Sequence, residues 1–164
     1  MLKVFESERI NYVRVDPNLI NEYLEMINDK EIKSLIGLDN IEISFDDEMN
    51  WIKEKMEDNS NTFSMIEKST NEYIGNIEIM NIENNIGELG ICITNEKCNK
   101  HYGREAIKRF LDYAYNELKL NTIYLNVHKD NLRAIKCYEK CNFIIDGEGK
   151  NKNDYHMTHR KKDI

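Results

Sequence analysis

A polar loop followed by a helix-forming stretch gives this chain a place where a phosphate group could bind. The apolar pattern of residues 86–94 breaks at residues 95–100, and from Gly103 onward apolar residues recur at helical spacing: Ile107, Phe110, Leu111, Ala114 and Leu118. The first-turn amides of a helix lack backbone partners and carry partial positive charge, so they suit an anion. The N–H groups expected to face it belong to Lys100, His101, Tyr102, Gly103 and Arg104.

The segments that must position this loop alternate between strand and helix. Residues 86–94 have a period of two from Leu89 onward, which indicates a strand. Residues 122–127 (TIYLNV) are rich in β-branched and aromatic side chains and predict a second strand. Residues 131–140 place Leu132, Ile135 and Tyr138 on one helix face. A strand-helix-strand-helix order follows.

Two motifs in this region resemble the GNAT superfamily of N-acetyltransferases, in the branch that holds ribosomal-protein and spermidine acetyltransferases. Residues 88–106 align without gaps with the pattern E-I-G-x-x-I-x-P-E-x-Q-G-K-G-Y-G-x-E-A, and residues 131–143 match N-x-x-A-x-x-x-Y-E-x-x-G-F. The resemblance implies an α/β (α+β) GNAT fold: a mixed, mostly antiparallel sheet of six to seven strands, flanked by helices and splayed at its central strands. At 164 residues we expect a single domain, 1–164.

The resemblance also implies acetyl-CoA as the acetyl donor, with residues 98–104 at the position of the pyrophosphate motif Q/R-x-x-G-x-G/A. Gly103 fits the last position, whereas Cys98 replaces Gln or Arg and Asn99 replaces a common Gly. His101 stands where the first motif Gly is expected, and it fits if its φ is negative or its side chain points away from the phosphate. An ordinary surface turn into a helix is the alternative.

The family places the pantetheine arm between the two core strands, where the backbone of Ile91 and Ile93 would bond it. Residue type alone would assign both to a core strand. Asn131 matches a family residue that hydrogen-bonds the arm or the backbone beside it, and it equally suits a helix cap. Asn142 replaces a family Gly, and Asn is the next best residue for a left-handed helix C-cap.

Acyl transfer to an amine also needs proton transfer at two points. Tyr138 matches the family tyrosine that protonates the departing thiolate; the alternative is an aromatic residue packing on the sheet. Glu88 begins the core strand where several relatives carry a glutamate that faces the cleft. It is the candidate general base for an amine whose pKa is near 10.4. A strand-end charge in solvent is the alternative for Glu88.

The rest of the chain supplies further strands and helices. Strands are expected over residues 10–15, 62–68, 73–82, 143–146 and 155–160; helices are expected after caps at Asp16, at Asn28 or Asp29, and at Ser44 with Asp47. In the resembling family this N-terminal helical region forms one wall of the acceptor cleft. The basic tail HRKKDI is expected to be a solvated end.

Charge and composition limit the classes of partner that the protein is expected to bind. Thirty acidic against 23 basic residues give a net charge of −7, which argues against nucleic acid and allows a cationic partner. We expect no signal peptide, no membrane span and a cytoplasmic protein. The four cysteines form no C-x-x-C motif and are expected to be reduced thiols. The four histidines are expected to be isolated polar residues without a metal.

Three hypotheses follow for function. The first is an acetyl-CoA-dependent N-acetyltransferase acting by direct attack in a ternary complex on a protein N-terminus, a polyamine, an aminosugar or another small amine. The second is a non-catalytic CoA-binding module, which the altered loop suggests and Tyr138 argues against. The third is an unrelated α/β protein that binds another phosphate at the helix terminus. The resemblance also makes a homodimer possible.

Overall fold

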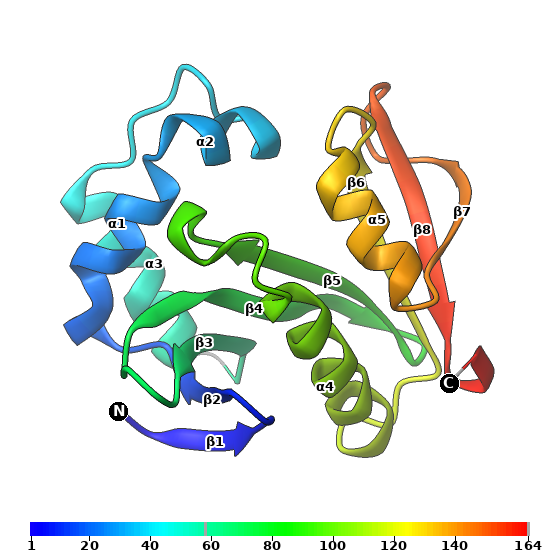
Figure 1. Ribbon diagram of the computed structural model, residues 1–164, viewed down its shortest axis with the longest axis horizontal. Coiled ribbons are helices and arrows are strands. Elements are labelled where there is room, and N and C mark those ends of the chain that lie inside the picture. The colour runs from blue at the N-terminus through cyan, green and yellow to red at the C-terminus, as the bar shows by residue number, and fades with distance from the viewer. Residues whose placement is uncertain (58, 164) are drawn as a thin grey trace. The chain divides into compact units, whose positions relative to one another are not determined.

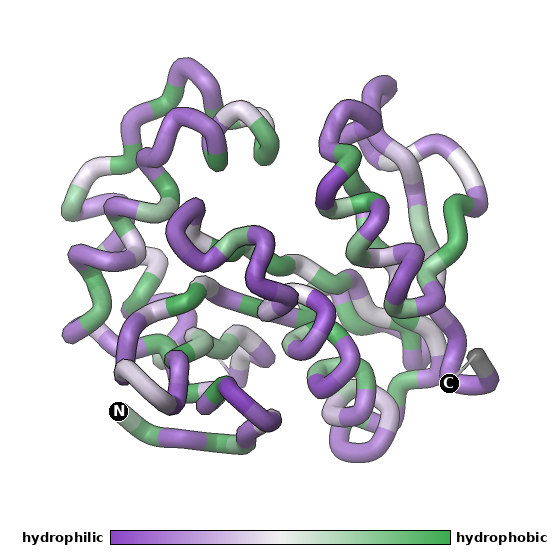
Figure 2. The backbone as a smooth tube through the Cα atoms, viewed as in Figure 1, coloured by the Kyte–Doolittle hydropathy of each residue, from purple (hydrophilic) through white to green (hydrophobic). Residues whose placement is uncertain are grey.

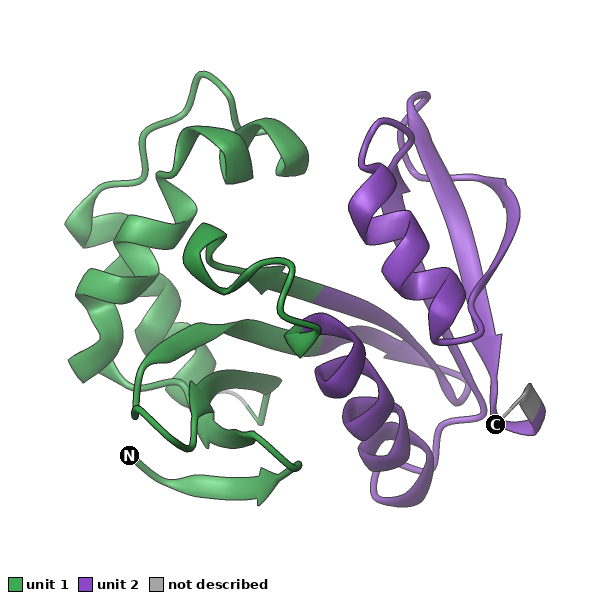
Figure 3. Ribbon diagram, viewed as in Figure 1, with its two compact units in different colours: residues 1–78, 91–102 green, residues 79–90, 103–164 purple. Residues whose placement is uncertain are grey.

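A computed structural model describes residues 1–57 and 59–163 of the chain. These residues form an eight-stranded sheet in the order β1-β2-β3-β4-β5-β6-β8-β7, together with five α-helices (Figure 1). The chain divides into two compact units, residues 1–78 with 91–102 and residues 79–90 with 103–164 (Figure 3). Strands β4 (Tyr73–Glu83) and β5 (Ile86–Ile93) each contribute to both units.

The first unit holds the N-terminal strands, three α-helices and two short 3-10 helices. β2 (Ile10–Arg14) pairs antiparallel with β1 (Lys3–Glu6) and with β3 (Asn61–Glu67). The helices of this unit are η1 (Pro17–Leu19), α1 (Ile20–Ile27), α2 (Lys30–Ile36), α3 (Phe45–Glu57) and the short η2 (Asn95–Lys97). The predicted strand at residues 10–15 and the predicted N-terminal helices are therefore confirmed.

Side-chain caps fix where these helices begin. Asp16 accepts a hydrogen bond from a first-turn amide at 2.8 Å, and Asp29 accepts from two such amides at 2.9 and 3.2 Å. Ser44 and Asp47 form a reciprocal box, each backbone N–H donating to the other's side chain at 3.1 Å. Because first-turn amides have no partner within the helix, each cap stabilises a helix start. The cap left open between Asn28 and Asp29 is Asp29.

The core of the first unit is built around Tyr23. Its ring is fully buried, makes edge contacts with Trp51 and Tyr73 at 5.7 and 5.5 Å, and its hydroxyl shares a 2.6 Å hydrogen bond with Ser64. Burying one such side chain contributes roughly 1.5–3 kcal/mol. The other buried members of this cluster are Val13, Val15, Leu19, Ile20, Met26, Ile32, Ile52 and Ile66.

The second unit holds the remaining elements of the chain. They are α4 (Tyr102–Asn116), β6 (Thr122–His128), α5 (Leu132–Lys140), β7 (Ile144–Glu148), β8 (Asp154–Arg160) and η3 (Lys161–Asp163). β6 runs parallel to β5, whereas β8 is antiparallel to both β6 and β7. Burial alternates along β6, where Ile123, Leu125 and Val127 are buried and the residues between them are half-buried. One face of β6 therefore faces the core and the other is polar.

The parallel pairing of β5 with β6 is short. Its register runs from Ile86↔Thr122 to Glu88↔Tyr124 among the described residues. β6 continues to His128 and remains paired with β8 over its whole length. The mixed sheet confirms the expected fold class.

Four details differ from the sequence analysis. β1 is an eighth strand that was not predicted, because four largely exposed edge residues carry little apolar pattern. β7 begins at Ile144 and extends to Glu148, and Phe143 is buried before it. The tail was expected to be a solvated end, but its first residue, His159, is a buried β8 residue that accepts or donates a 2.6 Å hydrogen bond with the Tyr115 hydroxyl. His159 is therefore not an isolated polar histidine.

Candidate active site

The loop that joins β5 to α4 has the polar character expected of an anion site. Figure 2 shows it mostly in the colour of hydrophilic residues. α4 begins at Tyr102, one residue before the predicted start at Gly103. The amides of Tyr102, Gly103 and Arg104 therefore lie in its first turn, where helical geometry gives an N–H no backbone partner within the helix.

Two non-glycine residues of this loop have left-handed backbone conformations. Asn99 has a φ of 60° and His101 a φ of 65°. The negative φ that would have accommodated His101 easily is thus not found. Instead His101 adopts the kind of conformation that the family's glycine would adopt readily, and Asn and His are among the non-glycine residues enriched there. The substitutions at these two positions keep a glycine-like backbone path.

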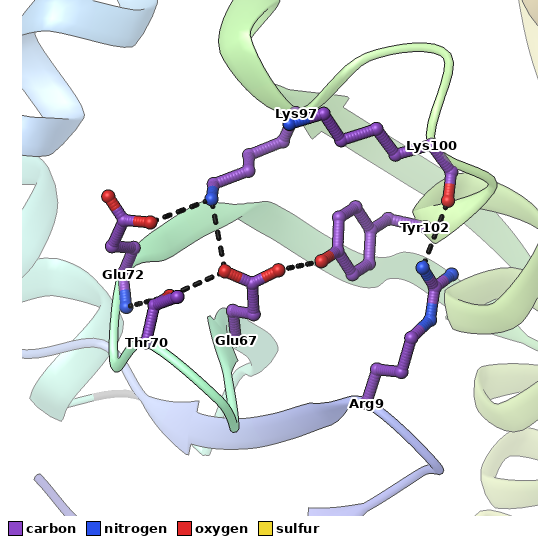
Figure 4. Close-up of polar contacts among 7 residues, drawn as sticks. All are labelled: Arg9, Glu67, Thr70, Glu72, Lys97, Lys100 and Tyr102. Atoms are coloured by element: carbon purple, nitrogen blue, oxygen red, sulfur yellow. Dashed lines mark hydrogen bonds and ion pairs between the residues drawn. The ribbon is translucent and has the colours of Figure 1, made fainter.

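Side chains from the first unit hold both ends of this loop (Figure 4). Lys97 is buried and its amine pairs with Glu67 at 3.1 Å and with Glu72 at 3.0 Å. The hydroxyl of Tyr102 donates to the other oxygen of Glu67. Arg9 lies over the Tyr102 ring, 4.1 Å from its centroid. Sequence reasoning missed all of these contacts, because no local pattern marks them.

The strand that leads into the loop carries Ile91 and Ile93. Both are half-buried residues near the end of β5. Next to them, the carbonyl oxygen of Cys92 would lie 2.0 Å from a β-carbon placed on Gly75 of β4, so a side chain at position 75 would collide with the β5 backbone. Gly75 therefore lets β4 and β5 approach closely at this level. The role of Ile91 and Ile93 in binding pantetheine stays a prediction.

In the second unit, Glu88 lies among hydrogen-bond donors. Its carboxylate accepts from Asn81 at 2.9 Å, from Asn126 at 3.2 Å and from the hydroxyl of Tyr124 at 3.4 Å. Burial, followed by the nearby Glu88 carboxylate, raises the pKa of Tyr124, which therefore remains a donor. Glu88 is half-buried, so its carboxylate is partly shielded from solvent, and its role as a general base stays a prediction. The surrounding amides and Tyr124 were missed in sequence reasoning.

A second acidic side chain lies further along the same sheet. The ring of Tyr124 stacks on His156 at 5.2 Å, and His156 Nδ1 lies 2.5 Å from Asp146 Oδ1. Burial acts to raise the pKa of Asp146, but hydrogen bonds from His156 and Thr158 hold it below its ordinary value. A polar row of side chains on this sheet thus contains two carboxylates, an amide and two stacked rings: Glu88, Tyr124, Asn126, His156 and Asp146.

The remaining predicted site residues lie on α5. Asn131 caps this helix, since its Oδ1 accepts from the amide of Ala134 at 3.3 Å, which establishes the capping role. Tyr138 is half-buried in the last turns of the helix, with its ring centroid 6.0 Å from that of Phe143. Asn142 has a φ of 70° just after the helix, as predicted for a left-handed C-cap.

Cys137 of α5 and Cys141, the C-cap residue of this helix, lie beside the start of α4. The thiol of Cys141 contacts the carbonyl of Arg104 at 3.9 Å. A hydrogen bond from Cys141 lowers the pKa of the Cys137 thiol, and the charges of Arg104 and Lys140 act in the same direction. The four cysteines are free thiols, as expected. Within residues 1–57 and 59–163, no group of three or more His, Cys, Asp or Glu side chains could hold a metal, and no helix is long and apolar enough to cross a bilayer.

Comparisons with known proteins show which family the chain resembles. Residues 9–144 match a family model described as "Acetyltransferase (GNAT) domain". A spermidine N(1)-acetyltransferase of Vibrio cholerae is 32% identical over 106 residues, which cover 63% of this chain and 61% of that protein. The match therefore spans less than two thirds of that relative's length.

Solved structures show the same fold. A GNAT-family acetyltransferase from Bacillus anthracis superposes with a TM-score of 0.85 at 19% identity, covering 99% of each chain. A spermidine N-acetyltransferase from Vibrio cholerae, crystallised with CoA and spermine, superposes with a TM-score of 0.84 at 24% identity, covering 94% of this chain and 97% of that one. At these identities the likeness concerns the fold.

Proposed function

Because the chain belongs to the GNAT acetyltransferase family, we propose that it is an acetyl-CoA-dependent N-acetyltransferase, which moves the acetyl group to a primary amine by direct attack in a ternary complex. The observation that carries this proposal is the family match over residues 9–144, which includes the loop, Glu88 and Tyr138. We take residues 1–164 to act as one catalytic domain.

The donor site is assigned to the loop and the strand before it. The backbone N–H groups of residues 98–104 hold the diphosphate of acetyl-CoA, and this role is supported by the glycine-like path of the loop and by the first-turn amides of α4. The pantetheine arm bonds the backbone of Ile91 and Ile93. Asn131 hydrogen-bonds the arm or the backbone beside it, in addition to capping α5. Bound acetyl-CoA supplies the thioester that the amine attacks.

We assign to Glu88 the removal of a proton from the incoming amine. An amine attacks in its neutral form, whereas most of it is protonated at neutral pH, so a carboxylate that removes this proton raises the reactive fraction. The hydrogen bonds from Asn81, Tyr124 and Asn126 support this role, because they fix the carboxylate in one orientation. The proton leaves the amine nitrogen for a Glu88 oxygen, directly or through a water molecule.

We assign to Tyr138 the donation of a proton to the departing thiolate. When the tetrahedral intermediate collapses, the carbon–sulfur bond breaks and the sulfur departs with the electron pair. The Tyr138 hydroxyl then donates its proton to that sulfur and recovers one from solvent. A half-buried position on α5 supports this role, since the hydroxyl of such a residue can reach a ligand while its ring packs on Phe143.

The acceptor that we favour is a small cationic amine such as a polyamine. The net charge of −7 suits a cation, and the relative from Vibrio cholerae that shares 32% identity is a spermidine N(1)-acetyltransferase. Protein N-termini and aminosugars are the competing acceptors. The family resemblance further suggests a cytoplasmic homodimer, which sedimentation of the purified protein and fractionation of cells would test.

The test is acetyl-CoA turnover with a panel of acceptors: spermidine, spermine, a peptide with a free N-terminus, an amino acid and an aminosugar. Release of free CoA thiol should depend on the amine and be fastest with the polyamines. CoA binding without amine-dependent thiol release from any acceptor would instead favour a non-catalytic CoA-binding module. Binding of a different nucleotide and not of CoA would reject the donor assignment.

A further inference from the structure

The loop that precedes α4 holds a backbone path that Asn99 and His101 favour less than glycine would. Asn99 and His101 both have φ values in the left-handed region, where a side chain crowds the backbone and a glycine does not. Such conformations persist where the surrounding structure fixes them. The neighbouring contacts therefore have to supply the restraint that glycines at these positions would make unnecessary.

One restraint acts at the start of the loop. The side chain of Lys97 is 9% exposed and bridges two carboxylates, those of Glu67 and Glu72, which flank the turn between β3 and β4. The hydrogen bonds that Lys97 donates to Glu72 first, and then to Glu67, raise the pKa of Lys97, so the ammonium stays charged. Removing one partner from a buried pair leaves an unmatched charge, which makes this contact hard to break.

A second restraint acts at the end of the loop. Tyr102 donates its hydroxyl to Glu67, the same carboxylate that binds Lys97. Arg9 lies over the Tyr102 ring and donates from Nη1 to the carbonyl oxygen of Lys100 at 3.0 Å. Figure 4 shows Glu67 between Lys97 and Tyr102, with Arg9 reaching the loop from the opposite side of the ring. Residues 98–101 are thus held at both ends.

We propose that Arg9, Glu67, Lys97 and Tyr102 form a loop clamp that positions the CoA-binding amides. Arg9, Glu67 and Lys97 are positioning residues: they hold residues 98–101 in the left-handed path, and that path presents the backbone N–H groups to the diphosphate. The clamp stabilises the left-handed backbone conformation that glycines would adopt readily in a loop of the usual motif. This inference rests on the proposed function, because it concerns the same donor site.

The first experiment compares CoA affinity in Glu67→Gln, Arg9→Met and the unaltered protein by titration calorimetry. Each substitution should raise the Kd for CoA by about tenfold, and the KM for acetyl-CoA should rise more than kcat falls. Arg9→Met is the milder change, since Arg9 is half-buried at the surface, and it covers the case in which Glu67→Gln folds poorly. The matched control is Lys129→Met, which removes an exposed pair with Glu148 at 2.8 Å and should leave Kd unchanged.

The second experiment is a rescue, which a general loss of stability would not produce. In the Glu67→Gln background, His101→Gly should recover most of the lost CoA affinity, because glycine adopts positive φ readily without a clamp. In the unaltered protein the same His101→Gly change should have a much smaller effect. A lower melting temperature with unchanged CoA affinity, or no recovery with His101→Gly, would overturn the clamp. Failure of the unaltered protein to bind CoA would overturn the proposed function itself.

Discussion

Glu88 and Tyr124 face each other at the final residue pair in the parallel register of β5 and β6, with the Tyr124 hydroxyl 3.4 Å from Glu88 Oε1. Two side-chain amides complete the shell of donors around the carboxylate. An acidic side chain held in this way is oriented before any substrate arrives. The strand pair therefore ends in a carboxylate with a defined direction, which suits proton transfer.

Replacing Glu88 by Gln should lower kcat/KM at neutral pH by about 10²–10⁴-fold if it removes the amine proton. The deficit should shrink as pH rises, because more of the amine is then already neutral in solution. The measurement is the pH dependence of initial rates with spermidine. The control is Glu148→Gln, which neutralises an exposed carboxylate paired with Lys129 at 2.8 Å and should leave the rate unchanged. A Glu88→Gln variant with an unchanged rate would make Glu88 a structural residue.

Tyr138→Phe should reduce turnover by about 10²-fold while leaving CoA affinity nearly unchanged. The reason is that phenylalanine keeps the ring contact with Phe143 but cannot protonate the departing thiolate. Steady-state kinetics combined with calorimetric titration separates the two effects. Turnover equal to that of the unaltered protein would remove Tyr138 from the mechanism.

Gly103→Asp should weaken CoA binding by tenfold or more, on the order of 1.4 kcal/mol, because it adds a negative charge and bulk beside the diphosphate in the first turn of α4. The control is Gly147→Asp, since a β-carbon at position 147 meets nothing within 4 Å. Unchanged affinity in the Gly103 variant would show that this loop does not bind the donor.

The loop clamp should also appear in the acid stability of the protein. Hydrogen bonds from Thr70 and Lys97 lower the pKa of Glu67, and those from Lys97 and Thr70 lower the pKa of Glu72, relative to the ordinary value of 4.5. Carboxylates with depressed pKa values stabilise the folded state above pH 4.5, and this contribution disappears as pH falls below that value. The melting temperature of the unaltered protein should therefore exceed that of Glu67→Gln above about pH 5, and this difference should disappear as the pH falls to about 3. A constant difference across this range would contradict the assignment.

Cys137 should be the thiol that reacts first with iodoacetamide. Its pKa is lowered by the hydrogen bond from Cys141 and by nearby positive charge, whereas burial raises the pKa of Cys92 to about 12. A lower pKa gives more thiolate at neutral pH, and the thiolate is the reactive form. Peptide mapping after brief alkylation at pH 7 would identify the site, and Cys137→Ser would remove it. Earlier labelling of Cys92 would contradict this order.

Local signals in the sequence predicted much of the fold. The caps at Asp16 and Ser44 were predicted because a helix start depends on a few adjacent residues. The cap at Asp29 was one of two alternatives with Asn28, and capping was one of two roles considered for Asn131. The left-handed residue at Asn142 was predicted for the same reason. β1 was missed because its four residues are mostly exposed and pair at the edge of the sheet.

The surroundings of the site depend on residues far apart in the chain. Arg9 and Lys100 are 91 positions apart, and Glu67 contacts Tyr102 across 35. No periodic pattern marks such pairs, because tertiary packing alone brings them together. The positive φ of His101 was not predicted either, since the sequence shows the missing glycine but not the contacts that replace it. The motifs thus predicted which residues could take part in the reaction, and the structure added the distant side chains that contact them.

The most direct test of the acetyl-transfer mechanism is to follow an isotopically labelled acetyl group by mass spectrometry. The protein is incubated with labelled acetyl-CoA and spermidine, and the masses of the amine and of the intact protein are then measured. We predict one labelled acetyl group on each product amine, an equal amount of free CoA, and no label on the protein. Label accumulating on the protein, for example on Cys137, or unlabelled spermidine beside intact acetyl-CoA, would contradict direct transfer from CoA to an amine.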